Sequence, residues 1–493
     1  MLLLGIDIGT SSIKVSVVEA STARALASAQ YPETEAPIIS KQAGWAEQEP
    51  ESWWNYFRMA MKQLNAKGKF KMKDIGAIGI AYQMHGLVIV DKQRKVLRPS
   101  IIWCDGRAVE LGNKAFEALG EEYCLKHFLN SPGNFTASKL AWVKENEPEI
   151  FRRTDKMMLP GDYLALQLTG EISTSASSLS EGILWNFQSE SPARGIMDYF
   201  GFNDTLLPPV KPVFSIHGNL TRAVADDLGL SPGIPVSYKA GDQPNNALSL
   251  NVLEPGELAA TAGTSGVIYA VSGEATYDPQ SRVNSFAHVN HASKQKRIGV
   301  LLCINGTGIM NRWVKENMSE DSSYAQMNHM AASIPLGCEG LFVLPFGNGA
   351  ERMLGNQMPG AAFSGLQTTI HTRAHIFRGV QEGIACAFRY GLDIMRENGL
   401  QPSVIRAGRA NMFLSDLFTE LFVNFTGAPV ELYQNDGSVG AAIGAGIGAG
   451  IFRSPSEAFQ NFKPISLTEP KKNRQVYEAL YDSWRNLLQK SLQ

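Results

Sequence analysis

Residues 2 to 20 read LLLGIDIGTSSIKVSVVEA, a pattern that predicts two strands joined by a tight turn. The turn consists of Gly9 and three hydroxyl residues, and Asp7 stands where the first apolar run ends. Glycine lets a backbone approach a ligand closely, and the N–H groups of a turn can converge on one oxygen-rich group. The stretch therefore predicts a hairpin that brings one acid and several hydrogen-bond donors to the same point.

A second stretch, ATAGTSGVIYAV at residues 260 to 271, repeats the pattern of DIGTSSIKVSVV at residues 7 to 18. In both, Gly-Thr-Ser and one small residue precede a β-branched strand. The two copies stand near the heads of two equal halves of the chain, which suggests a duplicated domain. Pro and Gly interrupt the pattern at residues 251 to 258, and we predict domains of residues 1–248 and 249–493.

The length and composition of the chain are those of an ordinary globular protein with more than one domain. Its 493 residues are too many for a single hydrophobic core, and 44% are hydrophobic and 19% charged. Strand-like and helix-like segments alternate, which indicates an α/β class. The net charge of −2 argues against nucleic acid or an anionic membrane as a partner, because both attract basic proteins.

Other composition features favour a reducing compartment. No basic segment precedes the first apolar run, so we expect no secretory signal and a cytoplasmic location. The apolar segment 439–452 is too short to cross a membrane, which takes about 20 residues. We interpret the glycines of this segment, Gly444 among them, as positions where a helix packs closely against its neighbours. Scattered cysteines without CxxC spacing predict free thiols and no zinc site: Cys104, Cys124, Cys303, Cys338 and Cys386.

Two facing Gly-Thr-Ser hairpins would suit an anion with several oxygens, such as a polyphosphate. One copy alone is more simply turn chemistry, but the pair and its acid favour phosphate. The chain has no GxxxxGK[ST] loop, so no P-loop lysine would neutralise the phosphate charge. Magnesium, held by carboxylates and by the phosphates themselves, is the natural counter-ion and gives Asp7 a role.

A second candidate acid, Asp242, lies in IPVSYKAGDQPNNALSL, residues 234 to 250. A strand, a turn at Gly241 and a helix with Pro244 near its start are predicted here. The segment alone favours Asp242 as the helix cap. The alternative places its carboxylate at the carboxyl end of a strand, where open α/β sheets bind ligands, as the base of a phosphoryl transfer to an alcohol. A cap also holds its side chain rigidly, so the two roles are compatible.

Two short segments offer groups that could hold that alcohol: YQMHG at residues 82 to 86 and WCDGR at residues 103 to 107. His85 has a donor and an acceptor, Asp105 accepts from hydroxyls, and Trp103 has a flat apolar face, which together suit a polyol. Each has a simpler structural interpretation when taken alone, since Asp-Gly is usually a turn. The eight histidines show no metal-binding spacing.

At these residues the chain resembles the FGGY carbohydrate kinases of the actin/Hsp70-like ATPase superfamily, and among them the xylulose kinases. The resemblance runs nearly end to end, and it implies two duplicated actin-like, ribonuclease-H-like ATPase domains with a cleft between them. The segments that carry it are GIDIGTSSIKV, KAGDQPNNAL, ATAGTSGVIYAV, LPFGNGAER (344–352) and RGVQEGIACAFR (378–389).

The resemblance also implies roles for particular residues. Asp242 would be the catalytic base and Asp7 would act at magnesium and phosphate, with both acids as candidate metal ligands. Gly408 and Asn411 would lie at the nucleotide base. The implied phosphate contacts are Thr10, Ser11, Gly263, Thr264 and Ser265. The implied sugar contacts are Gln83, Met84, His85, Trp103 and Asp105.

We therefore expect an ATP- and Mg²⁺-dependent kinase of a ketose, with D-xylulose as the first candidate. The QMHG segment also occurs in sedoheptulose kinases, so sedoheptulose, ribulose and other polyols stay open. A second hypothesis is an ATP-gated binding or assembly module on the same fold, which would not need the two polyol-type segments. The expected partners are a sugar and ATP, with no nucleic acid and no membrane, and a homodimer is left open.

Overall fold

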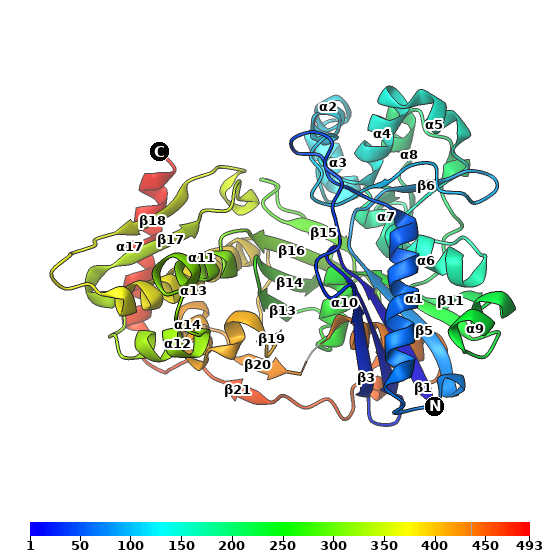
Figure 1. Cartoon of the computed structure of the whole chain (residues 1–493). Coiled ribbons are helices and arrows are strands. Elements are labelled where there is room, and N and C mark those ends of the chain that lie inside the picture. Colours follow the sequence, from blue (N-terminus) through cyan, green and yellow to red (C-terminus); the bar gives the residue numbers. More distant parts are fainter. Residues whose placement is uncertain (435) are drawn as a thin grey trace.

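The computed structural model describes residues 1–434 and 436–493, which form two lobes (Figure 1). The first lobe contains a sheet with the order β11-β12-β5-β1-β2-β3. The central strands β1, β5 and β12 are parallel, and β1 pairs antiparallel with β2, which confirms the predicted opening hairpin. The strands are β1 (Leu2–Ile8), β2 (Ile13–Glu19), β3 (Arg24–Tyr31), β5 (Ile75–Tyr82), β11 (Phe214–Asn219) and β12 (Pro235–Gly241).

The second lobe repeats this plan. Its sheet has the order β15-β16-β14-β13-β19-β20-β21, with β13, β19 and β20 parallel and β13 paired antiparallel with β14. The matching order of parallel and antiparallel pairs confirms the duplicated α/β fold. The strands are β13 (Glu257–Ala262), β14 (Gly266–Ser272), β15 (Asn284–Ala287), β16 (Ile298–Ile304), β19 (Val404–Gly408), β20 (Val430–Tyr433) and β21 (Ser466–Thr468).

Helices cover the sheets, and several of them form an additional layer on the first lobe (Figure 1). The helices of the first half are α1 (Pro50–Ala66), α2 (Val109–Leu119), α3 (Glu121–Phe128), α4 (Thr136–Asn146), α5 (Pro148–Arg153), α6 (Pro160–Thr169), α7 (Ala176–Glu181), α8 (Arg194–Phe200), α9 (Arg222–Leu228) and α10 (Asp242–Ser249). Those of the second half are α11 (Gly308–Met318), α12 (Tyr324–Ala332), α13 (Arg373–Glu397), α14 (Asp416–Thr426), α15 (Gly437–Gly448), α16 (Pro455–Ala458) and α17 (Gln475–Ser491). Short strand pairs complete the chain: β4 (Glu47–Gln48) with β7 (Ser100–Ile101), β6 (Val88–Val90) with β8 (Lys156–Met158), β9 (Trp185–Asn186) with β10 (Ser191–Pro192), and β17 (Phe342–Phe346) with β18 (Gly360–Ser364).

Helix α15 comes from the second half of the chain but packs on the sheet of the first lobe. A Cβ atom at Gly5 of β1 would overlap with the carbonyl oxygen of Ser438, and one at Gly79 of β5 would overlap with that of Ala441. Glycine is required at both positions because helix and sheet backbones touch there. The predicted close packing of the glycine-rich segment is thus confirmed.

Strand β15 joins the lobes from the other side. It is the edge strand of the second sheet, and its free backbone groups bond to side chains of the first lobe. Ser285 exchanges hydrogen bonds with the amide of Asn130, at 2.9 and 2.6 Å. Ala287 N donates to Ser180 Oγ (2.9 Å), and Ser177 Oγ donates to Ala287 O (2.7 Å). These bonds satisfy an edge that would otherwise be open.

The predicted boundary at residue 248 falls one residue before the end of α10, and the segment 250–256 leads into β13. Among the described residues, we find no helix with both the length and the apolar character that a membrane span needs.

The contact between α15 and the sheet leads to a stability prediction. Gly79→Ala should destabilise the protein by about 2 to 3 kcal/mol, because a backbone carbonyl cannot move aside without shifting the helix. Gly76→Ala, on the same strand, is the matched control, since its Cβ would meet only the flexible Met1 side chain. Urea unfolding should show a change of about 0.5 kcal/mol or less for this control. Equal effects of the two substitutions would contradict the packing argument.

Candidate active site

Two carboxylates converge at one edge of the first sheet. Asp7 lies near the end of β1, and Asp242 follows β12 directly. Strand β5 lies between them, with Asp7 beside Ala81 and Gly241 beside Tyr82 in the register. Because the carboxyl ends of parallel strands meet at the same edge, both side chains lie where α/β sheets bind ligands. Both are only partly buried.

Asp242 is the first residue of α10, and Gly241 occupies the N-cap position, so the cap interpretation of Asp242 was wrong. The side chain remains in the first turn, where the helix dipole favours a negative charge. Burial, followed by the negative charge of Asp7, raises the pKa of Asp242 to about 7. Burial and the charge of Asp436 also raise the pKa of Asp7 to about 6, against the lowering effect of Lys14.

The first Gly-Thr-Ser turn is bonded to the segments predicted to hold a polyol. Gly9 N donates to Ser12 O (3.0 Å) and closes the turn. Thr10 Oγ1 accepts from Trp103 Nε1 (2.9 Å) and donates to Gln83 Oε1 (3.1 Å). Ser11 is exposed. The predicted phosphate turn and the predicted sugar segments therefore form one structure.

The second Gly-Thr-Ser turn, Gly263 to Ser265, lies between β13 and β14 and is closed by the start of α11. Gly308 N donates to Gly263 O and Ile309 N donates to Thr264 O, both at 3.0 Å. A cavity of about 300 Å³ opens beside this turn. Asn411 lines it, whereas Gly408, at the end of β19, does not. The lining residues are Ala262, Gly263, Thr264, Gly308, Asn311, Arg312, Tyr324, Asn328, Asn411, Met412, Leu414 and Ser415.

His85 has a backbone φ of +63° and is fixed by Glu181. His85 N donates to Glu181 Oε2, and its Nδ1 lies 2.9 Å from the Glu181 carbonyl oxygen. A carbonyl can only accept, so we assign the proton to Nδ1, which leaves Nε2 as an acceptor. The ring packs against Phe135 and Phe286. Burial and the charge of Lys139 lower the pKa of His85 to about 3, so the ring is neutral at neutral pH.

The neighbouring predicted sugar residues differ in exposure. Met84 is buried, and its side chain packs against Gly241. Gln83 is also buried, and its amide bonds to Thr10 and, at 2.9 Å, to Gln48 Oε1. Trp103 is 53% exposed. Of these side chains, Trp103 is the one open to a ligand, and Gln83 connects segments of the protein.

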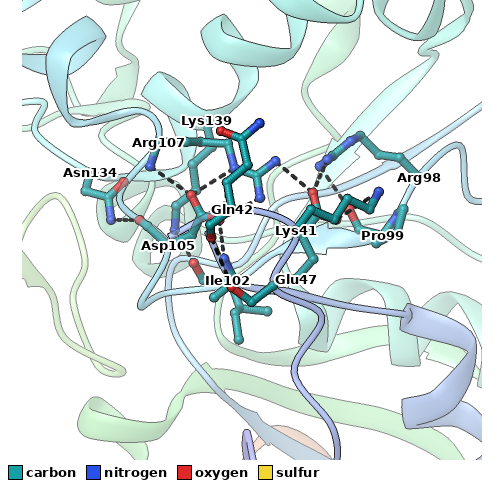
Figure 2. Close-up of polar contacts among 12 residues, drawn as sticks. Lys41, Gln42, Glu47, Arg98, Pro99, Ile102, Asp105, Arg107, Asn134 and Lys139 are labelled. Atoms are coloured by element: carbon teal, nitrogen blue, oxygen red, sulfur yellow. Dashed lines mark hydrogen bonds and ion pairs between the residues drawn. The ribbon is translucent and has the colours of Figure 1, made fainter. Parts of the chain in front are cut away.

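Asp105 is fully buried at the centre of a charged cluster (Figure 2). Its carboxylate accepts from the Arg107 guanidinium through two nitrogens and from Ala46 N. Arg107 also pairs with Glu47, which in turn pairs with Arg98. The contacts of Asp105 are thus with protein groups, where sugar hydroxyls were expected. They hold the WCDGR segment in place.

Several residues of this region have no sequence signal. Glu181 stands in a serine-rich stretch without a motif, and Lys139 lies in an ordinary helix. Tyr324 and Arg312 line the cavity from α12 and α11. Only the tertiary fold brings these residues to the site.

The fold and the site are typical of a phosphotransferase with two lobes. Two similar α/β lobes, each with a glycine-hydroxyl hairpin, and a pair of strand-end acids are the parts needed to hold a phosphate donor and an acceptor together.

Comparison with known proteins gives the family. The N-terminal domain of the FGGY family of carbohydrate kinases matches residues 2–249, and its C-terminal domain matches residues 258–449. The chain belongs to this family and is a carbohydrate kinase, a phosphotransferase that uses ATP. This result favours the kinase hypothesis over the binding module.

Individual relatives agree over nearly the full length. The xylulose kinase of Bacillus subtilis is 30% identical over 98% of this chain and 96% of its own. The crystal structure of xylulose kinase from Rhodospirillum rubrum has a TM-score of 0.87 at 25% identity and covers 99% of both chains. That of gluconate kinase from Lactobacillus acidophilus has a TM-score of 0.89 at 20% identity, over 100% of this chain and 98% of its own, and shows the fold alone.

The raised pKa of Asp242 predicts a pH-dependent stability. The folded protein retains the Asp242 proton up to about pH 7, whereas the ordinary pKa is 3.8. The native state holds more protons between these values, so its stability falls as the pH rises through this window. With EDTA present, Asp242→Asn should be more stable than the wild type by about 1 to 3 kcal/mol at pH 8, and by less at pH 5.

Asp226→Asn, in the exposed part of α9, is the control for this measurement and should match the wild type at both pH values. Unfolding curves of Asp242→Asn that coincide with those of the wild type at pH 8 would show that the Asp242 titration is not shifted.

Proposed function

We propose that the chain phosphorylates a ketose, with D-xylulose as the first candidate substrate and D-xylulose 5-phosphate as the product. The observation that carries this proposal is the near-complete alignment with relatives named xylulose kinases. The neutral His85, with Nε2 as an acceptor, and the open face of Trp103 support a substrate with hydroxyl donors and an apolar side.

In this proposal Asp242 is the catalytic base. It takes the proton of the attacking sugar hydroxyl while the new O–P bond forms and the bond between the γ-phosphorus and ADP breaks. Its raised pKa suits this role, because a base works best with a pKa close to the working pH. Positioning of the hydroxyl contributes a large part of the rate, since the transition state is loose.

Magnesium fits the donors at this edge of the sheet. Asp7 and Asp242 offer carboxylate oxygens, and Mg²⁺ commonly takes one or two carboxylates together with phosphate oxygens and water. Within residues 1–434 and 436–493, no cluster of three or more acidic, histidine or cysteine side chains could hold a metal by itself. Bound magnesium supplies positive charge to the phosphates, and Asp7 is its first candidate ligand.

The two hairpin turns hold the phosphates from opposite lobes, and the cavity beside the second turn receives the nucleotide base. The proposed phosphate contacts are Thr10, Ser11, Gly263, Thr264 and Ser265. Asn411 is the proposed base contact, because its side chain lies against Gly263 in the cavity lining. We place the reaction in the cytoplasm, where ATP is supplied.

A coupled assay of ADP release tests the substrate. With MgATP, D-xylulose should be used with a kcat/KM about tenfold or more above those of ribulose, sedoheptulose and glycerol. A sugar whose hydroxyls fit the site less well would leave polar groups of the site without hydrogen bonds, and this lowers its kcat/KM relative to that of D-xylulose. A higher kcat/KM for another sugar in the panel would replace the first candidate, and no sugar-stimulated ADP release would overturn the proposal.

Substitution of Asp242 tests the base. Asp242→Ala should lower kcat by about a thousandfold, because no other group takes the hydroxyl proton, while the Kd for ATP changes by about threefold or less. Calorimetry measures ATP binding and the coupled assay measures turnover, with Asp226→Asn as the control. Wild-type turnover by Asp242→Ala would remove Asp242 from the mechanism.

A further inference from the structure

Lys139 of α4 is completely buried and has no carboxylate in contact with it among the described residues. Its Nζ donates to two backbone carbonyl oxygens, those of His85 (2.9 Å) and Ile102 (3.0 Å). Burying an ammonium group without an ion-pair partner is costly, and the desolvation lowers the pKa of Lys139 to about 7. Apolar side chains fill such interior positions at lower cost, so this lysine calls for a specific explanation.

The two carbonyls belong to the two segments that face the proposed sugar. His85 carries the neutral imidazole, and Ile102 directly precedes Trp103. A backbone hydrogen bond from Leu87 N to Ile101 O (3.0 Å) already joins the bases of these segments. Lys139 adds a second link. It joins the carbonyl of His85 itself, two residues before Leu87, to the carbonyl of Ile102, one residue after Ile101 and directly before Trp103. Lys139 therefore acts close to the two residues whose side chains are proposed to contact the sugar, His85 and Trp103.

Each segment is also held separately from other directions. Thr136 Oγ1 donates to the same His85 carbonyl (3.3 Å), and Glu181 binds the His85 N–H. On the other segment, Asn134 Nδ2 donates to the carbonyl of Asp105, and the carboxylate of Asp105 is held by Arg107. Figure 2 shows Lys139 beside the contacts of Asp105 with Arg107 and Asn134. These bonds fix each segment to its surroundings. Lys139 bonds to both segments through their backbone carbonyls, whereas Thr10 bonds to both through the side chains of Gln83 and Trp103.

We propose that Lys139 is a positioning residue of the sugar site, whose ammonium group holds the His85 and Ile102 carbonyls together and so sets the spacing between the His85 imidazole and the Trp103 ring. This inference rests on the proposed function, because it assigns those two side chains to the sugar. It predicts that loss of the ammonium group affects sugar binding far more than nucleotide binding, since the cavity at Asn411 lies in the other lobe.

The test is Lys139→Met, which keeps the length of the side chain and removes the charge and the donors. Steady-state kinetics should show a KM for the sugar raised by about 10- to 100-fold, because a small displacement of a substrate-binding group has effects of this size. The KM for ATP should change by about threefold or less, since the nucleotide site is untouched. A sugar KM within about twofold of the wild type in the folded variant would overturn the inference. Equal rises in both KM values would do so as well, since they indicate general damage.

Lys144 provides a matched control on the same helix. Its Nζ also donates to two backbone carbonyls, those of Phe200 (2.5 Å) and Gly201 (3.0 Å), but these end α8, away from the sugar segments. Lys144→Met should lower the midpoint of thermal unfolding and leave the sugar KM within about twofold of the wild type. A sugar KM raised equally in both variants would show that the loss of either lysine weakens sugar binding only by destabilising the protein. That result would refute the positioning role of Lys139.

If Lys139→Met does not yield folded protein, Thr136→Val tests the same support with a smaller change. It removes only the hydroxyl donor to the His85 carbonyl, and the sugar KM should rise by about threefold with the ATP KM unchanged. An unchanged sugar KM would count against the inference. Failure of the proposed function looks different, because the wild type itself would then show no sugar-stimulated ADP release.

Discussion

The structure depends on the direct backbone contact between α15 and the first sheet. At Gly5 and Gly79 no side chain separates helix from strand, so no rotamer change can absorb a displacement. The helix follows Asp436, which pairs with Lys14 of β2, and its first residue, Gly437, abuts the Asp7 carboxylate. A helix from the second half of the chain thereby fixes the position of an acid in the first half. The packing of α15 on the first sheet and the position of the Asp7 carboxylate are therefore one constraint.

Hydrogen bonds connect the first Gly-Thr-Ser turn to the segments proposed to hold the sugar. Thr10 is bonded to Trp103 and Gln83, and Gln48 donates to the Thr10 carbonyl at 2.8 Å while it accepts from Gln83. A displacement of the first turn therefore moves the segments proposed to hold the sugar. Such a connected arrangement suits phosphoryl transfer, in which orientation of donor and acceptor supplies much of the rate. The buried side chains of Gln48 and Gln83 are tolerated because both have hydrogen-bond partners.

The sequence allowed the duplicated fold, the opening hairpin and the strand-end positions of Asp7 and Asp242 to be predicted, because strand patterns and turn residues are local signals. The roles of Asp105 and Gln83 were harder to predict. Their side chains suit a ligand, but both are buried and bonded to protein groups: Asp105 to Arg107 and Ala46, and Gln83 to Thr10 and Gln48. Glu181 is the opposite case, a residue of the site that was not predicted, because a single acid in a serine-rich stretch forms no recognisable motif. The exact cap of α10 was missed by one residue, which is the usual uncertainty at a helix end.

The fold does not choose the substrate, since a gluconate kinase and xylulose kinases share it. The choice lies in the side chains of the sugar site, and in the site proposed here the protonation state of His85 matters. Glu181 accepts from Nδ1 through its carbonyl, and burial keeps the ring neutral, so Nε2 presents a lone pair. A lone pair accepts from a hydroxyl and repels a carboxylate. In the proposed sugar site this acceptor favours an uncharged sugar over a sugar acid, because the Glu181 carbonyl fixes the tautomer of His85.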